Sequence, residues 1–204
     1  PGGTVATLFN TEWLGSWAPG SGAVLMPEGY GLHVEPGSAI VMQVHYNSTG
    51  GELESDQSAM DLRVETEPQK EAVFYRWTEP AWPLGVGMEI PANTDGVEHS
   101  LVYTQSDKDE PYTVHAVMPH MHTLGRAIDV RITHADGSES CLLSVSDFDF
   151  SWQRSYWLEE PVSIGAGDTL TMTCTWDNPT DEAVSWGDGT GDEMCLSIAV
   201  VTRD

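Results

Sequence analysis

The chain has 204 residues, 32 of them acidic and only 8 lysine or arginine, which gives a formal net charge of −24. Such an acidic excess argues against binding to nucleic acid or to anionic membranes, because both carry negative charge themselves. It suits an exported protein or one that works in high salt. No apolar run approaches the ~20 residues of a membrane-spanning helix, and the length allows one large or two small domains.

Residues 1–36 are rich in glycine and proline and contain only short candidate strands, at 5–9 and 31–34. The chain begins Pro1-Gly2-Gly3 without methionine, so we expect a processed or excised piece that has lost a targeting segment. Two longer segments, 39–46 and 60–65, alternate apolar and polar residues and are predicted to be strands.

The polar, proline-interrupted stretch 67–71 is the best candidate domain boundary, and we divide the chain into 1–68 and 69–204. The second part shows strand-like alternation at 72–77, 98–104, 112–118, 127–133, 139–145, 169–176 and 194–202, with Asp136-Gly137 as a hairpin turn. The aromatic residues of 147–157 are expected to pack rather than to contact a cofactor. No long helical period occurs, so we predict an all-β protein, an antiparallel β-sandwich.

Two histidines lie one residue apart in the segment Met118-Pro119-His120-Met121-His122-Thr123-Leu124-Gly125. If the segment is extended, His120 and His122 project from one face of a strand and can converge on one metal ion. The spacing is common, so by itself it leaves a metal site and an ordinary strand equally open.

About seventy residues downstream lies Gly189-Thr190-Gly191-Asp192-Glu193-Met194-Cys195. Met194 begins an alternation with Leu196, Ile198 and Val200, so taken alone it is best explained as one more core residue of a strand. The acidic residues of this loop also suggest a calcium site, although the spacing of an EF-hand is absent.

Together, "PHMHTLGR" and "GTGDEMC" resemble the C-terminal half of the copper type II, ascorbate-dependent monooxygenases. The resemblance implies a jelly-roll-like sandwich in which His120, His122 and Met194 bind the copper that activates oxygen. It also implies O2, a small-molecule substrate and ascorbate or a similar electron donor. Ligand chemistry agrees, because a thioether favours Cu(I) and imidazole accepts both Cu(I) and Cu(II), whereas zinc more often takes a third nitrogen, thiolate or carboxylate.

The same resemblance implies a disulfide between Cys174 and Cys195, the alternative being two buried free thiols. A disulfide would indicate a secreted, periplasmic or otherwise extracytoplasmic protein. Cys141 has no partner in this comparison and is expected to be buried rather than reactive.

The segment Gln43-Val44-His45-Tyr46-Asn47 is a second point of resemblance, to a ligand of the family's electron-transferring copper. His45 is therefore its candidate here, although a histidine hydrogen-bonded on a half-buried strand is the better explanation of the segment taken alone. The family takes the other two ligands from a His-His pair, and this chain has no adjacent histidines. A complete enzyme of the family has two coppers. We therefore expect one copper in this chain, a partial sandwich in residues 1–68, and a preceding N-terminal segment as a missing partner.

Three functions remain: a copper monooxygenase that hydroxylates a C–H bond, a copper-binding module without turnover, and a calcium-stabilised adhesion-type sandwich. The first agrees with the most residues. The family's peptide-amidating members have an arginine two residues before the first ligand histidine, where this chain has Met118, and polar residues where it has Leu196 and Ile198. A peptide ending in glycine is therefore not the expected substrate.

Overall fold

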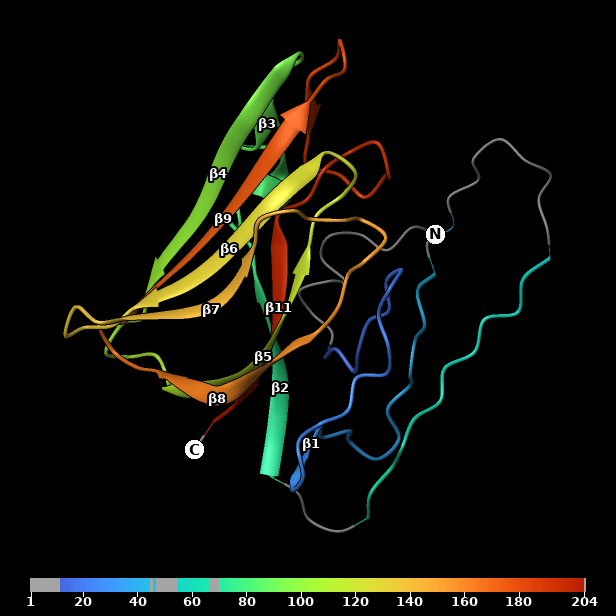
Figure 1. The fold of residues 1–204 in the computed structure, drawn as a ribbon. Coiled ribbons are helices and arrows are strands. Elements are labelled where there is room, and N and C mark those ends of the chain that lie inside the picture. The colour runs from blue at the N-terminus through green and yellow to red at the C-terminus, as the bar shows by residue number, and fades with distance from the viewer. Residues whose placement is uncertain (1–11, 45, 47–54, 67–69, 204) are drawn as a thin grey trace.

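Two β-sheets pack face to face to form the body of the protein (Figure 1). The computed structural model describes residues 12–44, 46, 55–66 and 70–203. One sheet has the order β1-β2-β11-β5-β8 and the other the order β4-β9-β6-β7, and a small two-stranded ladder, β10-β3, stands beside them. Among the strands of the described residues, all pairings are antiparallel except the two-residue contact of β1 with β2. The prediction of an all-β antiparallel sandwich is confirmed.

The strands are β1 (Tyr30–Gly31), β2 (Lys70–Trp77), β3 (Glu89–Ile90), β4 (Thr94–Thr104), β5 (Tyr112–His120), β6 (Gly125–Thr133), β7 (Glu139–Val145), β8 (Tyr156–Ile164), β9 (Thr169–Asn178), β10 (Val184–Ser185) and β11 (Leu196–Thr202). One short 3-10 helix, η1 (Trp82–Leu84), follows β2. In the described part of the chain, no helix is long and apolar enough to cross a membrane.

The core lies between the two sheets and follows from the alternation of their strands. In β9, every second residue from Leu170 to Asn178 is buried and its neighbours are only partly buried. Val117, Ala199 and Val201 point into the same layer from the opposite sheet. Each fully buried aliphatic side chain contributes roughly 1.5–3 kcal/mol to stability.

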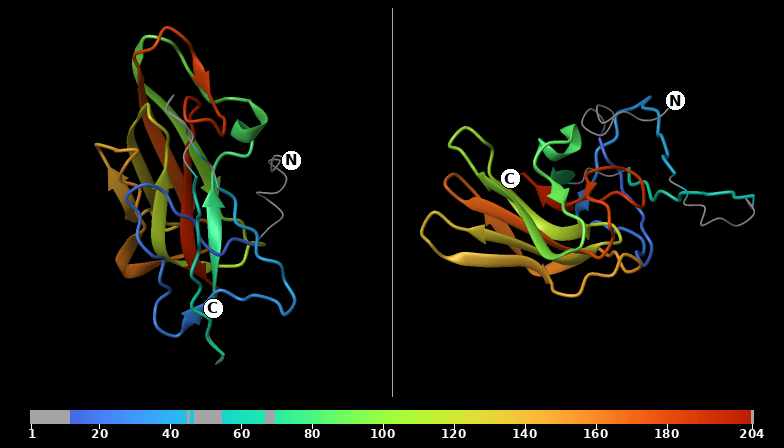
Figure 2. Two further views of the ribbon diagram at one scale, coloured as in Figure 1. Left: turned by 90° about the vertical axis from the view of Figure 1, so that its right-hand side faces the viewer. Right: turned by 90° about the horizontal axis from the view of Figure 1, so that it is seen from above.

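β5 is buried on both faces, because the N-terminal segment covers the outer side of its sheet. Met26, Tyr30 and Leu32 pack there against a second buried cluster formed by Ala72, Ala116 and Val200. In Figure 1 and in the view from above in Figure 2, this segment, drawn in blue, lies on the side of the five-stranded sheet that faces away from the four-stranded one. The strand that leads into the His-x-His segment is therefore held from two sides.

The strand predictions for 39–46 and 60–65 are wrong for the residues described there, which form no strand, and of 31–34 only Gly31 belongs to one. Alternation marks a face, but a strand also needs a neighbour for its backbone hydrogen bonds, and none lies beside these segments in the described structure. Their apolar side chains are consequently exposed, Val41 to 84% and Val64 to 79%. The candidate strand at 5–9 lies outside the described residues.

The sequence analysis missed β8, which contains Glu159, Glu160 and Pro161. Within the described structure β8 is an edge strand that pairs only with β5, and edges tolerate charge and proline. The strands predicted for the second part are all present, five of them two to four residues longer than expected and β11 two residues shorter.

Candidate metal centre

The two histidines of the His-x-His segment lie side by side where β5 ends. His120 is the last residue of β5 and His122 follows in the connection to β6. Their ring centroids are 5.1 Å apart and the ring planes are nearly perpendicular, at 81°. Phe150 closes one side, with its ring centroid 6.1 Å from that of His122. The structure thus brings both predicted ligands together.

Hydrogen bonds determine which ring nitrogen of His120 carries a proton. The Gln153 side-chain amide donates from Nε2 to the carbonyl oxygen of Phe150 at 2.9 Å, which leaves its Oε1 facing His120 Nδ1 at 2.6 Å. Because Oε1 only accepts, Nδ1 must donate and Nε2 keeps a free lone pair. Burial lowers the pKa of His120 to about 4. The hydrogen bond to Gln153 raises this pKa and the neighbouring His122 lowers it slightly, but burial dominates. The His120 ring is therefore neutral at neutral pH.

His122 is held in the same way by a main-chain group. Its Nδ1 lies 2.9 Å from the carbonyl oxygen of Asp192, which again can only accept. Both imidazoles therefore present Nε2 as the unprotonated nitrogen. Partners of this kind on the second ring nitrogen are the usual support of metal-bound histidines, so the donor set fits a metal.

Strand pairing places the residues that follow Met194 beside the strand that carries His120. β11 and β5 pair Leu196 with His120 and Ile198 with Met118, so these side chains share one side of the sheet. Met194 is half-buried and lies two residues before Leu196, outside β11. The alternation of β11, continued back by two residues, predicts that the Met194 thioether shares the face of Leu196 and His120.

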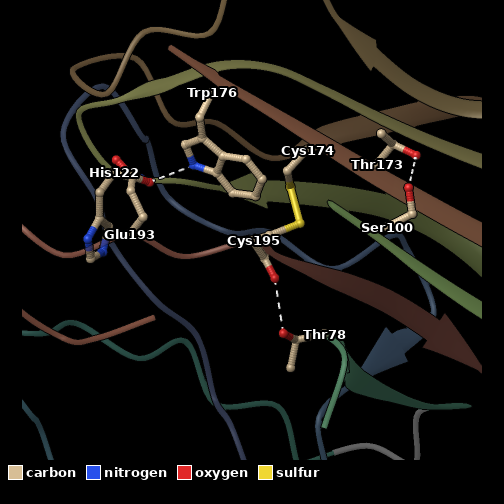
Figure 3. Close-up of a disulfide and its surroundings, with 8 residues drawn as sticks. All are labelled: Thr78, Ser100, His122, Thr173, Cys174, Trp176, Glu193 and Cys195. Carbon is tan, nitrogen blue, oxygen red and sulfur yellow. Dashed lines mark hydrogen bonds between the residues drawn. A yellow bond between two sulfur atoms is a disulfide. The ribbon is translucent and has the colours of Figure 1, made fainter. Parts of the chain in front are cut away.

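A buried carboxylate joins the segments that carry the candidate ligands. Glu193 is fully buried, and its oxygens accept hydrogen bonds from the backbone N–H of His122 at 2.9 Å and of Leu124 at 2.6 Å. It also accepts one from Trp176 Nε1 at 2.9 Å (Figure 3). Burial raises the pKa of Glu193 and these bonds partly offset the rise. The sequence analysis missed this role, although an acidic residue beside a predicted core strand was a signal for it.

The predicted disulfide is present. Cys174 of β9 is bonded to Cys195, the residue after Met194, across a sequence separation of 21 residues (Figure 3). The carbonyl oxygen of Cys195 also accepts a hydrogen bond from Thr78 Oγ1 at 3.0 Å. The backbone on both sides of Met194 is therefore attached to other strands.

Two further expectations have different outcomes. Cys141 is free but exposed, so the prediction that it is buried is wrong; alternation across β7 turns it to solvent from an edge strand of its sheet. His45 lies outside the described residues.

The remaining histidines that the structure describes have separate partners. His33 pairs with Glu35, His99 with the carbonyl oxygen of Glu89, His115 with Thr202, and His134 with Asp168 and Ser140. Among the described residues no group of three His, Cys, Asp or Glu could hold a metal. Two imidazoles and a thioether are the set that the candidate centre offers.

The acidic loop does not form a calcium cage either. Asp192 Oδ2 accepts the backbone N–H of Gly189 at 3.0 Å, and both oxygens of Glu193 are engaged inside the protein.

Residues 83–200 match the sequence profile described as "Copper type II ascorbate-dependent monooxygenase, C-terminal domain". This span is more than half of the chain, and the protein belongs to that family. The human protein named "DBH-like monooxygenase protein 1" is 36% identical over 96 residues, 46% of this chain and 15% of that protein. Its chicken counterpart is 38% identical over 93 residues, 44% of this chain and 15% of that protein. The matched part thus spans about 15% of the length of these relatives.

Among solved structures, the dimeric latent PorU of Porphyromonas gingivalis matches 65% of this chain and 13% of its own, with 8% identity and a TM-score of 0.18.

Proposed function

We propose that this chain carries the oxygen-activating copper site of a monooxygenase that hydroxylates a C–H bond with O2 and an ascorbate-type reductant. One observation supports the site above the others: His120 and His122 both direct Nδ1 to acceptors and leave Nε2 free, 5.1 Å apart between ring centroids. Met194 adds the soft ligand. When bound, copper would supply the one-electron chemistry that amino-acid side chains lack.

The chain's own residues would hold and enclose this ligand set. Gln153 and the Asp192 carbonyl fix the two imidazoles, while Glu193 and the disulfide fix the backbone on either side of Met194. Phe150 keeps water from one side of His122. Two imidazoles and a thioether leave coordination positions for solvent or oxygen, which a catalytic site needs and a purely structural one does not.

The substrate is proposed to be a small molecule. Met118 and Ile198, which share the ligand face, are 7% and 5% exposed and bring no charge to it. We propose further that residues 1–68 belong to an electron-transferring domain and 69–204 to the oxygen-activating one. The Cys174–Cys195 disulfide supports an extracytoplasmic location.

Copper titration tests the site. We expect one Cu(I) per chain, measured by competition with a chromogenic chelator under anaerobic conditions. A His120→Ala, His122→Ala double variant should bind none at this centre, while a His33→Ala, His134→Ala double variant should bind as the parent does. Full stoichiometry in the first variant would refute the site.

A copper-binding module without turnover remains the second candidate, because the chain has no adjacent histidine pair for an electron-transferring copper. Ascorbate-dependent oxygen uptake by the full-length protein separates the two.

A further inference from the structure

Residues 13–21 cross the outer face of the five-stranded sheet next to the candidate centre. Ser16 Oγ donates to the sulfur of Met118 at 3.4 Å, two residues before His120 on the same strand. The Trp13 ring lies 5.5 Å from the guanidinium of Arg76, which is paired with Ile198 on β11. The segment therefore contacts the strand face that carries the candidate ligands.

The segment then forms a tight turn at Ala18-Pro19-Gly20-Ser21. Ser21 N donates to the Ala18 carbonyl oxygen at 3.0 Å, and the Ser21 hydroxyl bonds both Ala18 N and Ala18 O, at 2.9 and 2.7 Å. These bonds fix the turn without help from the rest of the protein.

The turn is fitted against the loop that carries Gln153. The carbonyl oxygen of Pro19 accepts the backbone N–H of Gln153 at 2.9 Å. Gly20 has φ +83°, and a Cβ there would lie 2.7 Å from Ser151 O and from Trp152 Cα. Main-chain atoms cannot move aside as a flexible side chain does. Glycine is therefore required here both by the positive φ and by the lack of room for a Cβ.

Gln153 transmits this contact to the centre. Its side chain is 2% exposed and bridges the Phe150 carbonyl and His120 Nδ1. A continuous path thus runs from the Pro19 carbonyl through the Gln153 backbone and side-chain amide to the His120 ring. We propose that the turn 18–21 is a positioning element of the copper centre, which keeps the Nε2 of His120 directed at the metal. This inference rests on the proposed function.

Gly20→Ala tests it, with Gly22→Ala as matched control, because a Cβ at Gly22 meets nothing within 4 Å. The first readout is ring-nitrogen NMR of the metal-free protein. In the parent and in Gly22→Ala, His120 should show a single tautomer protonated on Nδ1. In Gly20→Ala it should show a mixture, while His122, held by Asp192, stays unchanged. The second readout is Cu(I) affinity, which should fall about tenfold in Gly20→Ala only, as when an outer-shell partner of a metal ligand is lost.

If Gly20→Ala does not fold, Ser21→Ala replaces it. This substitution removes the hydrogen bonds of the Ser21 hydroxyl within the turn but adds no atoms that could clash. We therefore expect the His120 tautomer and the Cu(I) affinity to change in the same direction as in Gly20→Ala, but less. An unchanged His120 tautomer and affinity in a folded variant would overturn the proposal. The NMR result does not depend on copper, so a chain that fails to bind copper at His120 would refute the proposed function and leave the positioning result readable.

Discussion

At the scale of single residues, the proposed copper centre consists of two kinds of group. The first are the donor atoms, two imidazole nitrogens and a thioether sulfur, and the second are the acceptors that orient the imidazoles. Acceptors on Nδ1 of His120 and His122 leave both Nε2 atoms free, and a neutral imidazole is the form that binds a metal. The thioether of Met194 completes the proposed set and favours the reduced metal.

Met194→Ile should therefore lower the affinity for Cu(I) by one to two orders of magnitude and the affinity for Cu(II) by much less, roughly as expected for loss of a soft ligand. Isoleucine keeps the apolar volume, which isolates the loss of sulfur. Chelator competition for Cu(I) and electron paramagnetic resonance for Cu(II) measure the two separately. Equal losses for both states would argue that Met194 is a core residue and not a ligand.

Glu193→Gln should destabilise the protein by about 1.5–3 kcal/mol, the range for a hydrogen bond to a charged group. The amide keeps the shape but places an N–H₂ group against N–H donors of His122, Leu124 or Trp176. Urea unfolding of the metal-free protein measures the loss. Glu98→Gln, at an exposed position of β4, serves as control and should stay within ~0.5 kcal/mol of the parent. A neutral result at Glu193 would mean that these bonds contribute little to holding the segment.

At the scale of elements, connections between strands decide which side chains meet. The disulfide joins β9 to the residue after Met194, and Asp168 joins the β8–β9 turn to the β6–β7 hairpin. Cys195 and Asp168 each lie directly before a strand, β11 and β9, where pairing alone would leave the chain free to move.

Peptide mapping without reduction should recover Cys174 linked to Cys195 and Cys141 alkylated in the native protein, since Cys141 is exposed. In the chain-entropy account, a loop of this length gives the disulfide about 3 kcal/mol. Reduction should lower the free energy of unfolding by that amount and weaken Cu(I) binding through Met194. A linkage from Cys141 to either of the other cysteines would contradict the assignment.

Asp168 should make stability fall in acid. Burial raises its pKa, but hydrogen bonds from the backbone N–H of Gly165 and Ala135 and from His134 outweigh this, so the pKa lies below 3.8. A depressed pKa contributes stability above the unfolded value that is lost as the pH falls through the folded one. As the pH falls below about 4, Asp168→Asn should therefore flatten the decline in unfolding free energy, whereas Asp107→Asn, at an exposed site, should not. If the unfolding free energies of the parent, Asp168→Asn and Asp107→Asn fall in parallel with pH, Asp168 is not a cause of the loss of stability in acid.

Much of the fold could be predicted at this scale, because alternation of apolar and polar residues indicates a strand with one buried face. β9 and β6 showed it clearly and were found. The alternation of 39–46 and 60–65 looked the same, but whether a strand forms depends on a neighbour that a single segment does not encode. The candidate ligands could be found through their motifs. The hydrogen-bond partners of Gln153 and Glu193 could not be identified, because they lie 33 and 71 residues away in the chain.

At the scale of the whole molecule, the proposed function sets a requirement for electrons that the 204-residue chain is not expected to meet alone. Hydroxylation takes two electrons per O2 and one copper stores one. The sequence has no adjacent histidines, and a single imidazole at His45 would not hold copper firmly against water.

We therefore expect this chain to bind one copper, at His120, His122 and Met194, and to show no product formation coupled to ascorbate oxidation. Joining a segment with two more histidines should restore the second copper and coupled oxygen consumption together. Oxygen-electrode and copper analyses of both chains measure this. Coupled turnover by the 204-residue chain would show that one copper suffices or that another residue completes a second site.

β2 lies outside the segment that the family match delimits, yet it belongs to the same sheet as the candidate ligands. It pairs with β11 over six residue pairs, from Ser197–Trp77 to Thr202–Ala72, and its successor Thr78 bonds the Cys195 carbonyl. A chain trimmed to residues 83–200 would open that side of β11 and bare its hydrogen-bonding groups, which invites pairing between molecules. Sequence similarity thus delimits the family here, whereas strand pairing extends the folded unit back at least to β2, which begins at Lys70.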